Sequence, residues 1–257
     1  MAAPPPFGSG CPVPHTRRDV VWLALGAGLG VAAGRLLYSR GKRWASSQKA
    51  DARCFTVALT GGPCGGKSSS LDTFSTALKT KGYDVYTVPE VPTILIKGGC
   101  EYPGHDGGDR LMAFEMGLIR LQMQIEESFL RIAASTGRPS VVVMDRGLMD
   151  IPAYLPAEQW KEVLAANELT EAELAARYDL VLHLKTAADG AEKFYTTDNN
   201  DARTETPAEA RALDEKMIAN WARAHSNVVV VDNSGTFSDK CARASAAVCE
   251  NVAAKLP

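Results

Sequence analysis

The amino-acid sequence predicts an α/β fold, with a mostly parallel five-stranded sheet between two layers of helices. Three observations support this prediction. Short apolar runs rich in β-branched residues alternate with amphipathic helical segments from residue 54 onwards. A glycine-rich segment joins the first apolar run to the first helical segment. A later apolar run, Val141–Asp145, ends in an acid. We therefore expect one three-layer α/β/α domain over residues 54–257.

The individual elements follow from hydrophobic periodicity and from helix-boundary signals. Apolar runs predict strands at 55–60, 83–88, 141–145, 180–184 and 228–232. Apolar residues at helical spacing predict helices at 68–81, 110–134, 156–167, 170–177, 207–224 and 238–255. Thr170 and Glu173 fit a capping box, and Ser238 is the expected cap of the last helix. The glycine-rich stretch 96–109 is expected to be a mobile loop, with His105 facing solvent.

The glycine-rich segment fits a phosphate-binding pattern, a glycine, four free positions and then Gly-Lys-Ser. Its residues are Gly61, Gly62, Pro63, Cys64, Gly65, Gly66, Lys67 and Ser68, followed by Ser69. Small residues let successive backbone N–H groups surround a polyphosphate, and the next helix points its positive end at the same charge. We expect Lys67 to contact the β- and γ-phosphates and Ser68 to bind Mg²⁺. The pattern predicts a P-loop NTPase fold that binds ATP or GTP.

Further candidates follow later strands, at the sheet edge where open α/β sheets bind ligands. Asp145 occupies the position expected for the second Mg²⁺-binding element. Glu90 follows the second strand and is a candidate for orienting or deprotonating an acceptor hydroxyl; an exposed loop acid is the alternative. Arg146 and Asp150 are candidates for binding the acceptor, and a structural salt bridge is the alternative for Arg146.

A polar, irregular stretch from 191 to 210 precedes the helix at 207–224. In small-molecule kinases, an arginine in such a loop closes over the transferring phosphoryl group. Arg203 is the first candidate for this catalytic role and Arg211 the second. His183 lies within an apolar run and is expected to be a core residue. No two of the six cysteines have CxxC spacing, so we expect neither a metal knuckle nor a disulfide framework.

Charge divides the chain into a basic N-terminal segment and an acidic body. Residues 1–50 contain seven Lys or Arg and one acid, whereas the remainder has 21 Lys or Arg and 29 acids. The acidic body argues against a nucleic-acid partner. We expect residues 1–19 to be disordered and residues 39–53 to form a basic linker. Residues 20–38 are a candidate N-terminal hydrophobic helix, because nineteen helical residues reach about 29 Å.

Residues 20–38 have three possible roles. A transmembrane anchor would place the domain on a membrane, with basic residues at 40, 42 and 43 favouring a cytoplasmic domain. A basic, acid-poor start also suits a mitochondrial or plastid targeting signal. A buried soluble helix is the third possibility, although its glycines would weaken it in water.

The motifs resemble those of a known family. The segment 61–67, Glu90, the turn at 145–147 and the segment 200–207 look like the P-loop domain shared by the kinase part of bacterial NadR and the fly TRPL translocation defect protein. The resemblance covers about residues 54–250 and implies an AAA-like or kinase-like fold that binds ATP or GTP. The bacterial relative phosphorylates a nicotinamide riboside, whereas the fly relative is a GTP- and phosphoinositide-binding trafficking factor. The fly relative has a further C-terminal domain, which we do not expect here.

Two functions follow as hypotheses. The first is Mg²⁺-dependent binding of ATP or GTP, with hydrolysis or phosphoryl transfer to a small-molecule acceptor. In it, Lys67, Asp145, Arg203 and Glu90 are the catalytic candidates. The alternative is a membrane-tethered switch or adaptor, in which the nucleotide controls a protein partner. No Asn-Lys-x-Asp motif for guanine is present, so the choice between ATP and GTP stays open.

Overall fold

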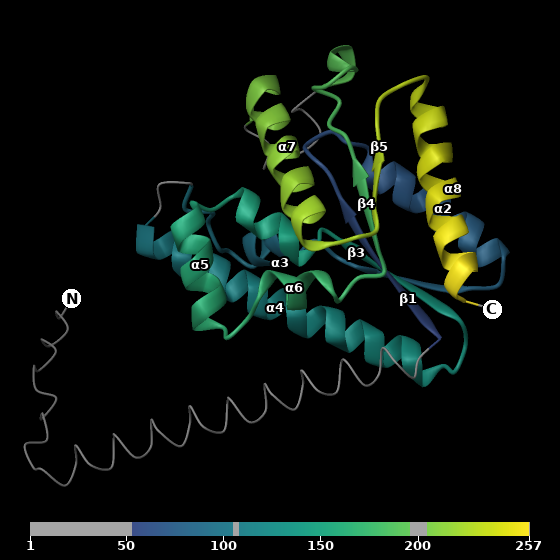
Figure 1. Ribbon diagram of the computed structural model, residues 1–257, viewed down its shortest axis with the longest axis horizontal. Helices are drawn as coiled ribbons and strands as arrows, with labels where there is room; N and C mark the ends of the chain where they lie inside the picture. The colour runs from purple at the N-terminus through teal and green to yellow at the C-terminus, as the bar shows by residue number, and fades with distance from the viewer. Residues whose placement is uncertain (1–52, 105–107, 196–204, 257) are drawn as a thin grey trace, which may run out of the picture. The chain divides into compact units, whose positions relative to one another are not determined.

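The computed structural model describes residues 53–104, 108–195 and 205–256. Five strands form one parallel sheet in the order β2-β3-β1-β4-β5 (Figure 1). The strands are β1 (Cys54–Thr60), β2 (Asp84–Val88), β3 (Ser140–Asp145), β4 (Leu180–Leu184) and β5 (Val228–Val231). Each pair of neighbours is parallel, so the carboxyl ends of all five strands lie at one edge of the sheet. The predicted five-stranded parallel sheet is confirmed.

Helices cover both faces of the sheet (Figure 1). The core that includes Phe74 and Val248 joins one face to α2 (Lys67–Thr80) and α8 (Phe237–Lys255). The core on the other face joins it to α3 (Val91–Lys97), α4 (Gly108–Ser135), α5 (Ala157–Ala166), α6 (Glu171–Ala175) and α7 (Pro207–Ala224). Two short 3-10 helices, η1 (Leu148–Ala153) and η2 (Glu192–Phe194), follow β3 and β4.

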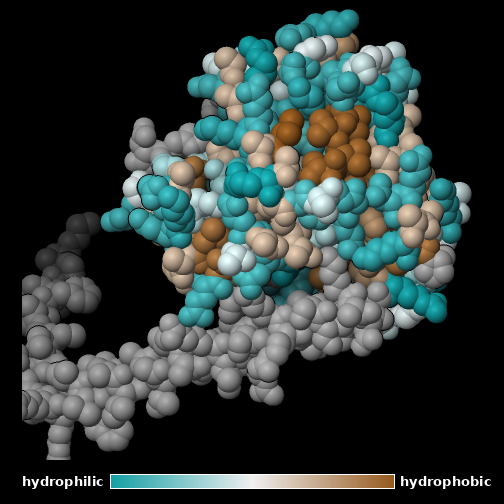
Figure 2. Space-filling view, viewed as in Figure 1, coloured by the Kyte–Doolittle hydropathy of each residue, from teal (hydrophilic) through white to brown (hydrophobic). Residues whose placement is uncertain are grey.

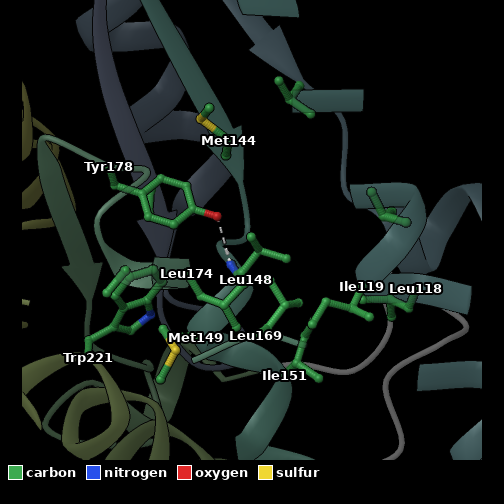
Figure 3. Close-up of a cluster of buried hydrophobic side chains, with 14 of the residues drawn as sticks. Leu118, Ile119, Met144, Leu148, Met149, Ile151, Leu169, Leu174, Tyr178 and Trp221 are labelled. Carbon is green, nitrogen blue, oxygen red and sulfur yellow. Dashed lines mark hydrogen bonds between the residues drawn. The ribbon is translucent and has the colours of Figure 1, made fainter. Parts of the chain in front are cut away.

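The two cores follow from the strand period of two. Successive residues of β1 point to opposite faces, so Val57 and Leu59 join the core beneath α2 and α8, whereas Ala58 joins the other. In that second core the rings of Tyr178 and Trp221 meet edge to face, with centroids 5.3 Å apart. The Tyr178 hydroxyl accepts a 2.9 Å hydrogen bond from the Leu148 N–H group, which ties the start of η1 to this core (Figure 3).

Strand order brings the candidate residues together. In the β1–β3 register, Leu59 lies opposite Asp145, and in the β1–β4 register Thr60 lies opposite His183. The connection after β1 leads to α2 on one face of the sheet. The connections after β3 and β4 lead to η1 and α7, respectively, on the other face. Such a divergence opens a crevice at the carboxyl ends of the strands, where ligands bind in open α/β sheets. The loop 61–66 lies at this position.

The last strand forms one edge of the sheet. The space-filling view shows an apolar patch where β5 lies in Figure 1, and Val230 of this strand is 45% exposed (Figure 2). The strand has four residues, and a short edge strand offers few backbone groups for pairing with another chain.

Two predictions about local structure need correction. The cap of α8 is Thr236, which forms a capping box with Asp239, rather than Ser238. The stretch 96–109 is not a single loop, because α3 extends to Lys97 and α4 begins at Gly108. A proline in the first turn of α3 fixes a helical φ angle, which favours a helix too short to show periodicity in sequence.

The predictions for residues 1–52 lie outside the described residues. This includes the candidate hydrophobic helix at 20–38. Among the helices in the described ranges, none has the length and apolar character needed to span a membrane. The described residues belong to one compact unit.

Candidate functional site

The loop between β1 and α2 packs so closely on its surroundings that a side chain would not fit at Gly61 or Gly66. Gly61 has a φ angle of 134°, and a Cβ atom on it would lie 2.1 Å from the Leu184 carbonyl oxygen at the end of β4. Gly66 has a φ angle of 84°, and a Cβ atom there would lie 2.7 Å from the Phe237 ring. Both φ values belong to the region that favours glycine. The glycines therefore fix the path of the loop across the sheet edge.

The start of α2 is open to an anion. Its N-cap, Gly66, has no side-chain cap, and its first turn contains no acid. By contrast, α6, α7 and α8 each begin with a threonine and an acid in a capping box. Unsatisfied N–H groups at a helix N-terminus bind phosphate well, because they donate hydrogen bonds and carry the positive end of the helix dipole. Ser68 and Ser69 are exposed in this turn.

Lys67 lies against the loop that precedes it. Its ammonium group donates hydrogen bonds to the carbonyl oxygens of Gly61 at 3.0 Å and Gly62 at 3.2 Å. Burial and the nearby Arg146 guanidinium lower the pKa of Lys67 to about 8. A negatively charged group above the loop would favour the charged ammonium form. The lysine is therefore placed to receive an anion.

Asp145 ends β3 beside this lysine. Its Oδ1 atom is buried and has no hydrogen-bond partner in the described part of the chain. Burial raises the pKa of Asp145, and the Lys67 ammonium opposes that effect. A buried carboxylate oxygen without a partner is costly, so a cation or a bound water would satisfy it. Together with the exposed Ser68 hydroxyl, Asp145 supplies the hard oxygen ligands that Mg²⁺ prefers.

Arg146 links the loop to β2. The residue has a φ angle of 79°, and its Nη1 group donates a 2.7 Å hydrogen bond to the Gly61 carbonyl oxygen. Its Nε atom lies 3.3 Å from Glu90 Oε1 in an ion pair. Burial alone would raise the pKa of Glu90. The Arg146 guanidinium and the hydrogen bond from the Thr93 hydroxyl lower it by more, so the net effect is a pKa below the usual value. An ionised, paired carboxylate is a weak base, so this geometry favours Glu90 as an orienting group rather than as a proton acceptor.

A network of side chains behind Arg146 holds its turn in place. Gln122 of α4 donates to the Arg146 carbonyl oxygen at 3.0 Å and to Glu126 at 3.2 Å. Glu126 is fully buried and accepts hydrogen bonds of 2.7 Å from both Arg177 and Tyr178. The fixed turn explains how a non-glycine residue keeps a left-handed conformation next to the site.

Asp150 lies beneath the site rather than in it. The side chain is 3% exposed, and its Oδ1 atom accepts hydrogen bonds from the Thr60 hydroxyl and, at 2.7 Å, from Trp221. Its Oδ2 atom accepts from the Gly147 N–H group at 3.3 Å. Both oxygens of Asp150 are engaged by the protein, which favours a structural role in the turn after β3 over binding of an acceptor.

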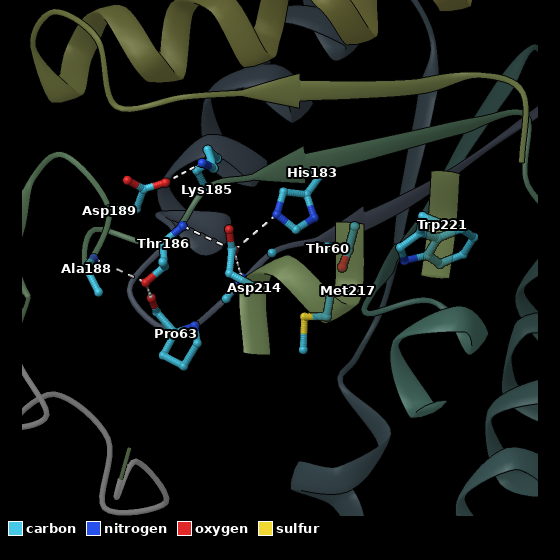
Figure 4. A network of polar contacts seen from close by, with 12 residues as sticks. Thr60, Pro63, His183, Lys185, Thr186, Ala188, Asp189, Asp214, Met217 and Trp221 are labelled. Carbon is cyan, nitrogen blue, oxygen red and sulfur yellow. Dashed lines mark hydrogen bonds and ion pairs between the residues drawn. The ribbon is translucent and has the colours of Figure 1, made fainter. Parts of the chain in front are cut away.

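Asp214 of α7 is a residue that sequence reasoning missed. Its Oδ1 atom accepts hydrogen bonds from the N–H groups of Gly62 at 2.7 Å and Thr186 at 3.2 Å (Figure 4). The same oxygen lies 3.1 Å from His183 Nε2. Burial alone would raise the pKa of Asp214, but His183 and the backbone N–H groups lower it below its usual value. An ionised carboxylate only accepts, so His183 Nε2 carries the proton. The sequence signal was an acid among the apolar positions 210, 213, 217 and 221 of one helix.

Glu115 is a second missed residue. It is 2% exposed on α4, makes no hydrogen bond or ion pair within the described ranges, and burial raises its pKa to about 7. It lies close enough to Tyr102 to raise the pKa of that phenol, together with burial. Tyr154, whose pKa burial raises to about 12, interacts electrostatically with both Tyr102 and Arg146. These residues extend the site from Arg146 towards α4.

Arg203 and His105 lie outside the described residues. Arg211, the second arginine candidate, lies in α7 and donates a 2.7 Å hydrogen bond to the Ala188 carbonyl oxygen. His183, expected in the core, is fully buried.

The family of this chain follows from a comparison with known protein families. Residues 56–240 match a family described as an AAA domain. The chain belongs to this AAA-domain family. The match runs from β1 into α8 and therefore contains the whole site described above. A search of curated proteins gives no match.

Solved structures extend the comparison. The AAA-domain chain is similar to a structure described as NadR protein in complex with NAD and AMP-PNP, with a TM-score of 0.53 and 14% identity. The similarity covers 90% of this chain and 59% of the NadR chain, so it spans less than two thirds of that protein. A shikimate kinase from Acinetobacter baumannii, in complex with shikimate, has a TM-score of 0.45 and 16% identity, covering 82% and 99% of the two chains. The family match confirms the predicted AAA-like domain, and the NadR likeness confirms the predicted fold.

Proposed function

We propose that the protein binds Mg²⁺ with ATP or GTP and transfers the γ-phosphoryl group to a small-molecule acceptor or to water. One observation carries this proposal: a buried Asp145 oxygen, with no hydrogen-bond partner among the described residues, lies at the same edge as Lys67 and the uncapped start of α2. Phosphoryl transfer depends on positioning and on charge stabilisation, and these groups supply both. The solved NadR structure contains AMP-PNP, an ATP analogue, which supports a nucleotide at this loop.

The phosphates would lie along residues 61–69. The N–H groups of the loop and of the first turn of α2 donate to the phosphate oxygens, and Lys67 contacts the β- and γ-phosphates. Ser68 and Asp145 would hold Mg²⁺, directly or through water. When bound, the metal neutralises charge that develops on the phosphates. Arg203 is our candidate for the cation that closes over the transferring group.

The acceptor would lie on the β2 and β3 side of the loop. Glu90 is fixed there by its ion pair with Arg146. Tyr154 and Glu115 continue the site towards α4. In this arrangement Glu90 orients the attacking hydroxyl, and Arg146 binds the transferred phosphoryl group or the acceptor.

The first experiment identifies the nucleotide and the product. Full-length protein is purified, and nucleotide that co-purifies is identified by mass spectrometry. Turnover of ATP and GTP is then measured with Mg²⁺, with and without a panel of small hydroxyl acceptors. A phosphorylated acceptor supports a kinase, and release of inorganic phosphate alone supports an NTPase.

Asp145→Asn provides the matched variant for the same assay. Its side chain has nearly the same shape but carries no charge, so we expect turnover to fall about a hundredfold or more while the fold is retained. Wild-type turnover in Asp145→Asn, with Mg²⁺ dependence unchanged, would contradict the metal assignment.

The membrane-tethered switch is the second candidate. Slow hydrolysis with tight retention of the nucleotide, and no phosphorylated acceptor, would favour it. Its membrane part depends on residues 20–38 and is tested by fractionating the full chain beside a chain lacking residues 1–50. Equal distribution of the two would remove the anchor from the proposal.

A further inference from the structure

We propose that the base of the bound nucleotide stacks on the ring of Phe237. This inference rests on the proposed function, because it concerns the same nucleotide. Phe237 is the first residue of α8 and is 54% exposed, although it shares a helix face with Cys241, Ala244 and Val248, which are buried. A single exposed apolar side chain is ordinary. What distinguishes Phe237 is its position beside the phosphate loop.

The ring lies directly beside the phosphate loop. A Cβ atom on Gly66 would come within 2.7 Å of the Phe237 Cε2 atom. Gly66 immediately precedes Lys67 and caps the helix that receives the phosphates. A ring in contact with this glycine is therefore within one nucleotide's length of the phosphates.

The direction of the nucleotide follows from the two halves of the site. Asp145, Arg146 and Glu90 lie at the ends of β3 and β2, and their electrostatic effects converge on Lys67. Phosphoryl transfer requires the γ-phosphate to face the acceptor groups, so the γ end lies over this half. The base is at the other end of the molecule. The base must then extend over the ends of β4 and β5, which lie on the opposite side of β1. Phe237 follows β5 at the start of α8.

The loops beneath Phe237 are held together by hydrogen bonds. Lys240 is 3% exposed and donates to the Lys185 carbonyl oxygen at 2.6 Å and to Asn233 Oδ1 at 2.7 Å. Asn233 in turn donates to the carbonyl oxygens of Thr186 at 2.7 Å and Asp189 at 2.6 Å. A buried lysine and a half-buried asparagine thus join the loop after β4 to the loop after β5.

The same unit contacts the phosphate loop and the start of α8. The Thr186 hydroxyl donates a hydrogen bond to the Pro63 carbonyl oxygen (Figure 4). Thr236 and Asp239 form the capping box that fixes the first turn of α8. Phe237 lies between these two residues, so its backbone is fixed before any ligand binds. Such preorganisation lowers the entropy lost on binding.

Stacking on an aromatic ring suits every base, because each presents a flat π face. Phe237 therefore contributes affinity for the base without choosing between adenine and guanine. Replacing an aromatic platform by alanine weakens base binding by about tenfold or more. Inorganic tripolyphosphate has the phosphates but no base, so its binding should not depend on this ring.

The experiment compares ligands with and without a base. Dissociation constants for Mg²⁺ with ATP, GTP and inorganic tripolyphosphate are measured on the full chain and on Phe237→Ala, Phe237→Trp and Ile132→Ala. Ile132 is equally exposed, at 54%, but lies near the end of α4, away from the loop, and serves as the control. We expect Phe237→Ala to weaken ATP and GTP by about tenfold or more and to leave tripolyphosphate within about twofold. Phe237→Trp should retain affinity for both nucleotides.

Fluorescence gives a second readout. The emission that Phe237→Trp adds to the wild-type spectrum should be quenched by ATP and not by tripolyphosphate, because only ATP brings a base to the ring. Unchanged ATP affinity in Phe237→Ala, equal weakening of ATP and tripolyphosphate, or an added emission that ATP leaves unquenched would overturn the inference. Failure of the wild-type protein to bind any of the three ligands would instead contradict the proposed function.

Discussion

Replacing Glu115 by glutamine should stabilise the protein at pH 8 much more than at pH 5. The carboxyl group is 2% exposed, and burial raises its pKa from 4.5 to about 7. A raised acid pKa means that the folded state binds the proton more tightly than the unfolded state. The group therefore costs little below about pH 4.5, where both states are protonated. Its cost grows as the pH rises and is complete above about pH 7.

The size of the effect follows from the shift. Each pKa unit corresponds to 1.36 kcal/mol, so a shift of about two and a half units gives a full cost of about 3 kcal/mol. About 1 kcal/mol of this is already present at pH 5, because the unfolded carboxyl group is partly ionised there. The stability of Glu115→Gln relative to wild type should therefore rise by about 2 kcal/mol between pH 5 and pH 8.

Urea unfolding at pH 5, 6, 7 and 8 measures this difference for wild type and Glu115→Gln in the absence of nucleotide. Glu162→Gln is the control, because Glu162 is exposed on α5 and its replacement should leave the difference flat across the range. A difference between Glu115→Gln and wild type that does not change with pH would refute the reasoning. It would show that Glu115 is either solvated or paired in the folded protein.

Two further predictions concern the networks that hold the site. Asp214→Ala leaves the N–H groups of Gly62 and Thr186 without their shared acceptor. The free energy of unfolding, measured in urea, should therefore fall by about 1–3 kcal/mol, and nucleotide affinity, measured by calorimetry, should fall with it. Wild-type values for both quantities would contradict this. Arg177→Met leaves Glu126 buried without its ion-pair partner and should cost about 3–5 kcal/mol in the same unfolding assay, and a loss below about 1 kcal/mol would show that Glu126 is not held as an ion pair.

The sequence predicted those parts of the fold that depend on local patterns. The five strands were found within one residue at either end, because a continuous apolar run is visible without its partners. The loop 61–66 was also predicted, because the phosphate-loop pattern specifies residue types at fixed spacing. The strand order was not predicted, since it depends on pairing between segments far apart in the chain. The position of Asp145 opposite Leu59 therefore emerged only in the structure.

The same limit applies to the site. Asp214 approaches Gly62 across 152 positions of sequence, and no local pattern in either segment indicates the contact. The apolar stripe predicts the helix that contains Glu115. The burial of Glu115 depends on how α4 packs against the sheet, which the stripe does not indicate. The cap of α8 was misplaced although Thr236 and Asp239 satisfy the capping rule, because Ser238 also resembles a cap.

The most direct test of the proposed nucleotide site is the affinity of Lys67→Ala for Mg²⁺ with ATP and with GTP. Isothermal titration on the full chain compares it with wild type and with Lys81→Ala, which removes an exposed lysine at the other end of α2. Loss of a charge-assisted contact predicts an affinity at least about tenfold weaker for Lys67→Ala and unchanged for Lys81→Ala. Wild-type nucleotide affinity in Lys67→Ala would contradict the assignment of this loop as the phosphate site.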